Sequence, residues 1–160
     1  MGPSQPAGRG RGLPGPRARR RLRGRGARVK RLRAATGDAF DAGRQMLAPL
    51  LSAAGPRITA AAFANDHLAC GTLMQAASQG VAVPGRIALL GFGDFPIGRQ
   101  LQPSLSTLRP PTAEIGQVAA QAVLESVGEG LDPASRALPC QLIARDSTGG
   151  AAAADSAAPH

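Results

Sequence analysis

The middle of the chain alternates between apolar runs and a helical pattern, and each run ends in polar residues or glycine. The apolar run Ile58–Phe63 is followed by Asn65-Asp66, and the run Ile87–Leu90 is followed by Gly-Phe-Gly-Asp, which ends at Asp94. Between the two runs lies a stretch of helical periodicity that stops at Gly80. This order predicts a strand–helix–strand unit with a right-handed crossover. Because open parallel sheets bind ligands beyond the carboxyl ends of their strands, we expect these polar residues to carry the function.

Apolar residues at three- and four-residue spacing predict a helix before this unit and define the helix within it. The first helix runs from Ala39 to Ala53, with Asp38 as its N-cap and Gly55-Pro56 as its end. Its apolar face comprises Phe40, Gly43, Leu47, Leu50, Leu51 and Ala54. The helix inside the unit has Asp66 as its predicted N-cap. Its expected buried face comprises Leu68, Ala69, Leu73, Ala76 and Ala77.

The last part of the chain predicts a third helix between two short strands. Leu105–Leu108 and Leu138–Ala144 read as the strands, and Thr112–Val127 reads as the helix, with Thr112 as its cap. The apolar stripe of this helix comprises Ile115, Val118, Ala119, Ala122, Val123 and Val127. The run Ile58–Phe63 does not alternate, as expected for a strand that is covered on both faces. The predicted fold class is therefore α/β, with a parallel sheet flanked by helices.

Charge divides the 160 residues into segments of different character. Residues 1–33 hold twelve of the nineteen Lys and Arg and none of the ten Asp and Glu, so the remainder has seven basic and ten acidic residues. We therefore divide the chain into a disordered Arg/Gly/Pro-rich segment (1–35), one modest domain (36–149) and a disordered tail (150–160).

Three interpretations of the Arg-rich segment remain open. GC-rich codons give Arg, Gly, Pro and Ala in any reading frame, so the segment fits a frame-shifted or mis-started beginning. It also fits a nucleic-acid-binding arm that gains affinity by counterion release, although the segment has no aromatic residues for base stacking. A plain solvated linker is the third interpretation.

Several classes of protein do not fit the sequence. Cys70 and Cys140 are far apart and lack metal-ligand spacing, so we expect reduced thiols in a cytosolic protein and no metal or cofactor. No apolar run is long enough for a membrane span, and no secretory signal is present. Gly91-Phe-Gly93 does not open a dinucleotide loop, because Pro96 stands where that motif needs glycine. His67 reads as a helix-surface residue and forms no catalytic triad, so we do not expect an enzyme.

Five motifs in one order resemble the effector-binding core of the LacI/GalR family of transcriptional regulators. They are Phe63-x-Asn65-Asp66-x-x-Ala69-x-Gly71, Gly80-x-x-Val83-Pro84-x-x-Ile87-Ala88-x-x-Gly91-Phe92-x-Asp94, Pro103-x-Leu105-Ser106-Thr107-x-Arg109, Glu114-x-Gly116 and Arg145-x-Ser147-Thr148. Phe40-x-x-Gly43-Arg44 upstream fits as well. The resemblance covers about residues 36–149 and implies a two-lobed, periplasmic-binding-protein-like core that binds sugars between its lobes.

The resemblance also implies partners. Family members bind a sugar or sugar acid as effector, bind operator DNA through a helix-turn-helix, and form homodimers. This chain matches only the last part of that plan, so we expect a truncated sensor without the helix-turn-helix and without most of the N-terminal lobe. The alternative is a basic nucleic-acid-binding protein that acts through residues 1–33. On the family pattern the dimer interface includes Leu68, Cys70 and Leu101.

The effector-binding residues implied by the resemblance are Asn65, Gly93, Phe40, Arg109 and Asp94. Asn65 matches an asparagine that hydrogen-bonds sugar hydroxyls, and its alternative is a turn residue that bonds its own backbone. Phe40 either lines the cleft or packs in the core. Gly93 replaces the family's usual sugar-binding aspartate, a form that resembles the gluconate-regulator branch and favours a sugar acid. Arg109 could then supply the countercharge or simply be solvated, and Asp94 could brace the following loop.

Overall fold

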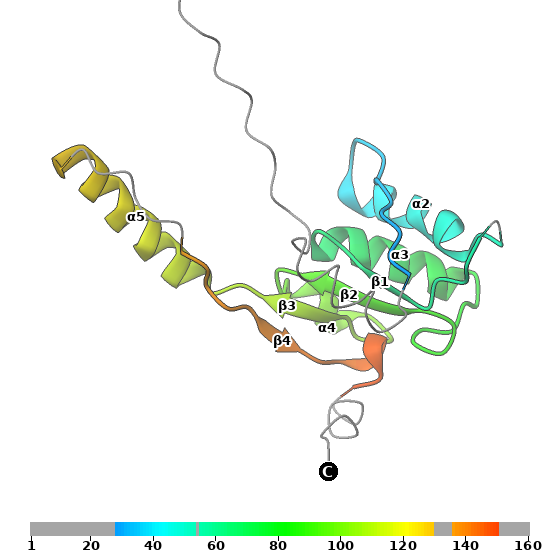
Figure 1. The fold of residues 1–160 in the computed structure, drawn as a ribbon. Coiled ribbons are helices and arrows are strands. Elements are labelled where there is room, and N and C mark those ends of the chain that lie inside the picture. Colours follow the sequence, from blue (N-terminus) through cyan, green and yellow to red (C-terminus); the bar gives the residue numbers. More distant parts are fainter. Residues whose placement is uncertain (1–27, 54, 130–135, 151–160) are drawn as a thin grey trace, which may run out of the picture. The chain divides into compact units, whose positions relative to one another are not determined.

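The computed structural model describes residues 28–53, 55–129 and 136–150, and the fold lies in the unit that begins at Ala34. Four strands form one sheet in the order β1-β2-β3-β4 (Figure 1). In chain order the elements are α2 (Ala39–Leu51), β1 (Ala60–Ala62), α3 (Asp66–Ser78), β2 (Ala88–Phe92), α4 (Ile97–Gln100), β3 (Ser106–Arg109), α5 (Thr112–Glu129), β4 (Gln141–Ile143) and the 3₁₀ turn η1 (Asp146–Thr148).

The sheet is mixed rather than purely parallel. β1 pairs with β2 and β2 with β3 in parallel, whereas β4 runs antiparallel to β3 and pairs Thr107 with Ile143. The predicted α/β class is therefore confirmed, with an antiparallel last strand. The expectation that the first strand is covered on both faces is wrong, because Ala60 and Ala62 are exposed.

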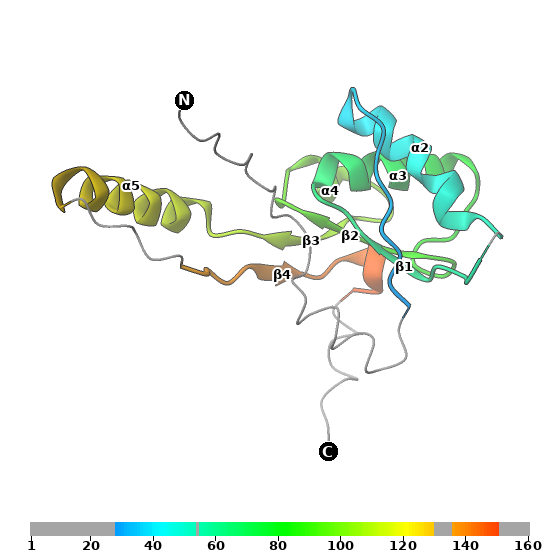
Figure 2. The same ribbon diagram turned by 45° about the horizontal axis from the view of Figure 1, so that its top comes forward.

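The helices build the core in layers above the sheet. α3 packs on β2, and α2 packs on α3 (Figure 2). The core between these layers contains the fully buried side chains of Leu47, Leu73, Ile87, Leu89 and Leu105. Asp38 caps α2 as predicted, since its carboxylate accepts hydrogen bonds from the Phe40 and Asp41 amides at 2.8 and 3.1 Å. Gly80, at φ +64°, follows the end of α3 in the left-handed conformation that commonly ends a helix.

Some predicted helix details were wrong. α2 ends at Leu51, with Ser52 as its C-cap, and position 54 lies outside the described residues. Ala77 is exposed, while Cys70, Gly71 and Thr72 complete the buried face of α3. Thr112 is the first residue of α5 rather than its cap, because the Ile115 amide already donates to the Pro111 carbonyl. The predicted final strand shortens to Gln141–Ile143.

α5 extends away from the sheet in both ribbon views (Figure 1, Figure 2). Its predicted apolar stripe is largely exposed: Ile115 is 44%, Val123 62% and Val127 83% accessible. Within the described residues, no helix combines the length and the apolar character needed to cross a membrane.

Two glycines let α2 and α3 meet backbone to backbone. A Cβ on Gly43 would lie 2.2 Å from the Leu68 carbonyl oxygen, and one on Gly71 would lie 2.1 Å from the Phe40 carbonyl oxygen. The Thr72 hydroxyl donates to the Gly43 carbonyl at 2.6 Å across the same contact. Because neither backbone can give way cheaply, the helix pair depends on both glycines.

We expect Gly71→Ala to lower the free energy of unfolding by about 2–3 kcal/mol, because the new methyl group collides with the α2 backbone. Urea denaturation followed by circular dichroism measures this change. Gly116→Ala is the matched control, since a Cβ there meets nothing within 4 Å. In an exposed helix that substitution should be neutral or stabilising by up to about 1 kcal/mol. Equal midpoints for the two variants would contradict the close helix approach.

Candidate functional site

The candidate site lies where the three parallel strands end. Asn65 follows β1, Gly93 follows β2 and Arg109 is the last residue of β3. The register pairs Ala62 with Leu90 and Phe92 with Leu108, so these three residues come to the same edge of the sheet. The sequence predicted Asn65 and Gly93 at the carboxyl ends of neighbouring strands, and the topology agrees.

Asn65, not Asp66, is the N-cap of α3. Its Oδ1 accepts a hydrogen bond from the Leu68 amide at 2.9 Å, so the prediction that Asp66 caps this helix was wrong. The Asn65 side chain is half-buried, and its Nδ2 donates to no described residue. The amide therefore uses its acceptor for the fold and keeps its donor for another partner.

The buried side chain of Asp66 instead links α3 to β3 and to the loop after β2. Its side chain is within the core, and its two carboxylate oxygens accept from the Thr107 hydroxyl and the Phe95 amide, both at 2.7 Å. A Cβ on Gly91 would lie 2.0 Å from Asp66 Oδ1, so β2 needs glycine there for the carboxylate to fit. Asp66 thereby fixes the loop after β2 against α3 and β3.

Three rings form a row beside this edge. The His67 ring lies between Phe40 and Phe95, with both centroid separations at 4.8 Å. His67 is half-buried, so its reading as a plain helix-surface residue was incomplete. Phe40 is half-buried and contributes a ring to the row, and its assignment to the cleft or to the core stays a prediction. We call Phe40, His67 and Phe95 the aromatic row.

Gly93 lies beside the Phe95 ring of the aromatic row and directly precedes Asp94. Its φ of +128° is a conformation that side-chain-bearing residues rarely adopt. A Cβ there would also approach the Phe95 ring to 3.1 Å. The backbone conformation at position 93 therefore favours glycine, and any larger residue would also have to displace the Phe95 ring by a few tenths of an ångström.

Asp94 binds three arginines. Its Oδ2 accepts from Arg109 Nε at 2.8 Å, from Arg109 Nη2, and from Arg99 Nη2 at 3.0 Å, while its Oδ1 accepts from Arg145 Nη2. The Asp94 side chain is only 3% exposed. This arrangement gives Asp94 a bracing role and leaves it little surface to offer a ligand. We call Asp94, Arg99, Arg109 and Arg145 the arginine cluster.

The cluster holds the Asp94 carboxyl ionised. Burial raises its pKa, but hydrogen bonds from Arg145 and Arg109, the charge of Arg145 and the hydrogen bond from Arg99 outweigh burial. Together they lower the pKa from 3.8 to about 2. Arg145 comes from the segment after β4 and also donates to the Leu105 carbonyl at 2.7 Å, so the cluster joins distant parts of the chain.

The sequence analysis did not single out Arg99, His67 or Phe95 for this edge. Arg99 lies on the one-turn helix α4, in a stretch without clear periodicity, and no spacing rule points it toward Asp94. Phe95 follows the Gly-Phe-Gly-Asp motif directly, and that adjacency was the available signal. The described residues contain no group of three or more His, Cys, Asp and Glu that could hold a metal ion.

The residues expected at a dimer interface differ in accessibility. Leu68 and Leu101 are half-buried, whereas Cys70 has no exposed surface in this chain. Burial, followed by the charge of Asp66, raises the pKa of the Cys70 thiol to about 11. Cys70 therefore packs as a small apolar residue, and a surface on this face would depend on its neighbours. Both described cysteines are free thiols, as expected.

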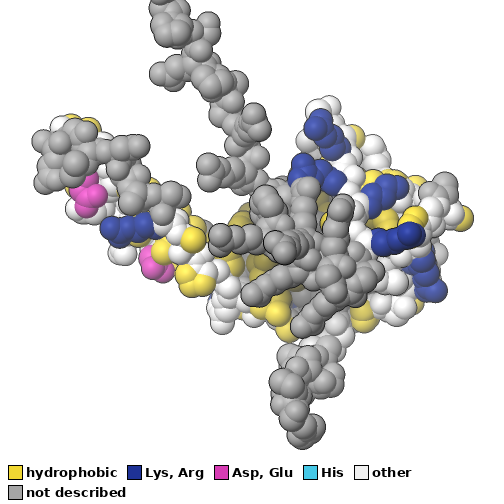
Figure 3. All heavy atoms as spheres, viewed as in Figure 1, with side chains coloured by type: hydrophobic (Ala, Val, Ile, Leu, Met, Phe, Trp, Pro, Cys, Tyr) yellow, Lys and Arg dark blue, Asp and Glu magenta, His cyan; other side chains and the backbone are white. Residues whose placement is uncertain are grey.

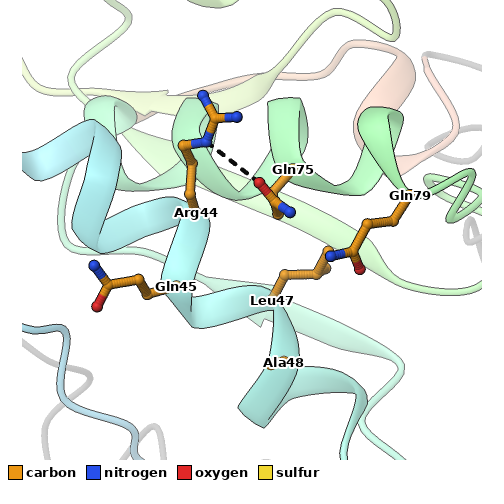
Figure 4. A pocket seen from close by; sticks show the side chains of 6 residues that line it. All are labelled: Arg44, Gln45, Leu47, Ala48, Gln75 and Gln79. Atoms are coloured by element: carbon orange, nitrogen blue, oxygen red, sulfur yellow. Dashed lines mark hydrogen bonds between the residues drawn. The ribbon is translucent and has the colours of Figure 1, made fainter.

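A shallow hollow lies elsewhere, between α2 and the far end of α3 (Figure 4). It is lined by Arg44, Gln45, Leu47, Ala48, Gln75 and Gln79. Arg44 Nε donates to Gln75 Oε1 at 3.3 Å across it. Gln75 and Gln79 lie about 15–20 Å along the helix from Asn65 at 1.5 Å per residue. The hollow is therefore separate from the strand-end site. Figure 3 shows basic side chains over the region of α2 and α3 and also beside α5, where the acidic side chains in view lie.

Comparison with known proteins agrees with this architecture. Residues 8–148 match the family described as periplasmic binding protein-like domain. The match begins within the Arg-rich segment. It covers more than half of the chain, which therefore belongs to this family, in the form found in LacI-type transcriptional regulators.

Individual relatives point the same way. The chain is 38% identical over 99 residues to the HTH-type transcriptional regulator GntR of Pseudomonas aeruginosa, covering 61% of this chain and 29% of that protein. It is 35% identical over 116 residues to the HTH-type transcriptional repressor CytR of Escherichia coli, covering 71% and 34%. A putative LacI-family regulator from Sanguibacter keddieii superposes with a TM-score of 0.70 at 36% identity, covering 82% and 51%.

The chain spans about a third of the length of these two curated relatives. Both relatives are transcriptional regulators by name. The comparisons give no support to the alternative of a basic nucleic-acid-binding protein, and residues 1–27 lie outside the described residues.

We expect Asp94→Asn to lower the free energy of unfolding at pH 7 by about 2–4 kcal/mol, because three arginines lose their shared counter-charge. The lowered pKa of Asp94 also sets the pH dependence. The stabilisation is complete above about pH 4 and disappears as the pH falls toward 2, so the variant should lose less stability over that range.

Denaturant titrations from pH 7 to pH 2 measure both effects. Asp41→Asn is the control, since Asp41 is an exposed first-turn residue whose carboxylate pairs with no arginine among the described residues. That change should stay within about 0.5 kcal/mol. An Asp94→Asn variant as stable as this control would show that the arginine cluster does not brace the loop.

Proposed function

We propose that this chain is the ligand-sensing part of a LacI-type transcriptional regulator and that it recognises a sugar or sugar acid at the strand-end site. The observation that carries the proposal is the placement of Asn65 and Gly93 at one edge of the sheet, beside the aromatic row. Relatives that share this fold are named as regulators, which supports the regulatory role.

The chemistry of the edge suits a polyhydroxylated ligand. Asn65 keeps an Nδ2 donor while its Oδ1 caps α3, so it can donate to a sugar hydroxyl without unfolding the helix end. The aromatic row offers an apolar surface of the kind that lines ligand sites, and Phe95 is 36% exposed. Gly93 adds no side chain between this surface and the arginine cluster.

The charge of the edge favours a sugar acid over a neutral sugar. Gly93 supplies no carboxylate, and Arg109 is 46% exposed at the end of β3 although it also pairs with Asp94. An anionic ligand would meet attraction here rather than like-charge repulsion. This is the role that the resemblance implied for Arg109.

The other properties of the regulator follow from its relatives and belong to the same proposal. These are operator binding through a helix-turn-helix that the described residues do not form, a cytoplasmic location, the absence of enzymatic activity, and a homodimer. Leu68 in α3 and Leu101 directly after α4 are the residues proposed for the dimer surface. The described residues supply one wall of the sugar site, so this chain alone should bind its ligand more weakly than micromolar.

Two substitutions of Asn65 separate its structural role from its ligand role. Asn65→Ala removes the helix cap and should cost about 1 kcal/mol of stability. Asn65→Ser retains a capping oxygen but replaces the longer amide and its two N–H donors with a single hydroxyl nearer the backbone, so stability should change by only a few tenths of a kcal/mol. Both variants should bind D-gluconate about five- to tenfold more weakly, as expected for one lost hydrogen bond.

NMR titration of the isotopically labelled chain with D-gluconate measures binding, and urea denaturation measures stability. The Asn65 and Gly93 amide signals should shift on titration. An Asn65→Ser variant that binds like the parent would remove Asn65 from the ligand site. Micromolar affinity in the parent chain would contradict the single-wall description.

A further inference from the structure

We propose that Arg99 and Arg109 together form the anion-recognition part of this site and bind the carboxylate or phosphate group of the sugar ligand. The proposal rests on the proposed sugar-sensing function and names the residues and the chemical group that would give it selectivity. Arg99 has no role in the sequence analysis, and its position follows only from the structure.

The guanidinium groups of Arg99 and Arg109 lie next to each other. Arg99 Nη2 and Arg109 Nη2 both donate to one atom, Asp94 Oδ2. Two guanidinium groups that share one oxygen are neighbours, although they come from α4 and from the end of β3. Asp94 thus orients both groups before any ligand arrives, which reduces the ordering cost of binding.

The arginine cluster carries an excess of positive charge. Three arginines surround one carboxylate, so the arginine cluster carries a net charge of about +2 with each guanidinium at +1 and the carboxylate at −1. The other carboxylate at this edge, Asp66, is 1% exposed and already accepts from Thr107 and Phe95. A ligand anion would supply charge that the described residues leave unbalanced.

The side chains of Arg99 and Arg109 are accessible to a ligand. The Arg99 side chain is 52% exposed and that of Arg109 is 46% exposed, whereas that of Arg145 is only 14% exposed. A guanidinium has five N–H donors, and Arg99 uses one of them on a described residue. Arg109 spends Nε and Nη2 on Asp94 and directs Nη1 toward Gln141 at 3.4 Å. Arg99 therefore has the more open donor set.

The other contacts of Asp94 separate the proposed ligand role of Arg99 from folding. Arg145 holds the opposite oxygen, Asp94 Oδ1, and also donates to the Leu105 carbonyl. Asp94 would therefore keep two arginine partners if Arg99 were neutralised. This division allows Arg99 to be tested without dismantling the cluster.

The test compares D-gluconate, D-glucose 6-phosphate and D-glucose as ligands of the 160-residue chain by NMR titration. We expect at least one of the two anions to bind about tenfold more tightly than glucose, as expected for one charge-assisted hydrogen bond. The tighter anion identifies the group as carboxylate or phosphate. The Nε–H signals of Arg99 and Arg109 should shift with that anion and not with glucose, and the preference should weaken with added salt.

Arg99→Gln should abolish most of this preference and leave the affinity for glucose within about twofold, since the charge-assisted term is the one removed. Arg44→Gln is the matched control, because it removes the same charge from the distant hollow between α2 and α3. It should leave the preference intact. Urea midpoints of both variants should match the parent and show that folding is preserved.

The outcomes separate the two proposals. Equal affinity for anionic and neutral sugars, or equal effects of Arg99→Gln and Arg44→Gln, would overturn the anion site while leaving sugar sensing in place. Failure of all three sugars to bind would overturn the proposed function and the anion site with it. An unstable Arg99→Gln variant would contradict the separation of ligand binding from folding at Arg99. Arg99→Lys then supplies the test, because it keeps the charge but loses the planar fork and should retain only part of the preference.

Discussion

The strand-end site depends on the hydrogen bonds that the buried carboxylate of Asp66 accepts. Burying a polar group costs free energy unless its hydrogen-bonding capacity is used, and here the Thr107 hydroxyl and the Phe95 amide use it. The first partner lies in β3 and the second in the loop after β2, so one side chain from α3 fixes both. Gly91 makes room for the carboxylate between them. These hydrogen bonds determine where the loop that contains Gly93, Asp94 and Phe95 can lie.

The arginine cluster extends this order from the loop to the end of the chain. Asp94 has a φ of +57°, in the left-handed region that aspartate tolerates better than most residues. Its backbone amide approaches the same Thr107 hydroxyl that donates to Asp66, at 3.4 Å. Thr107 Oγ1 thus contacts both the Asp66 carboxylate and the Asp94 backbone, while the Asp94 carboxylate binds the three arginines. Arg145 connects Asp94 with the segment after β4, where Ser147 and Thr148 bond to β2 and β3.

The sequence predicted the order of elements because their periodicities are local, and it missed the contacts that depend on two distant segments. Asn65 and Asp66 show the limit well. Both are good capping residues, and sequence alone assigned the cap to the wrong neighbour, because the choice depends on Thr107 and Phe95. Cys70 and Thr72 are buried for a similar reason, since α2 approaches α3 closely at Gly43 and Gly71. The length of β4 depends on its pairing with β3, and the position of Arg99 depends on its ion pair with Asp94. Neither contact leaves a periodic signal in the sequence.

The exposed face of α5 shows how the fold separates two kinds of apolar surface. Leu47, Leu73 and Leu89 are buried by neighbours from within the described residues, whereas Val123, Leu124 and Val127 in α5 stay 62–83% exposed although their spacing is equally regular. Regular spacing reports that a helix has an apolar face, and says nothing of what covers it. The strand-end site does not need that face, since its ties run through Asp66, Asp94 and Arg145. The described contacts that fix the strand-end residues are therefore different from the exposed apolar face of α5.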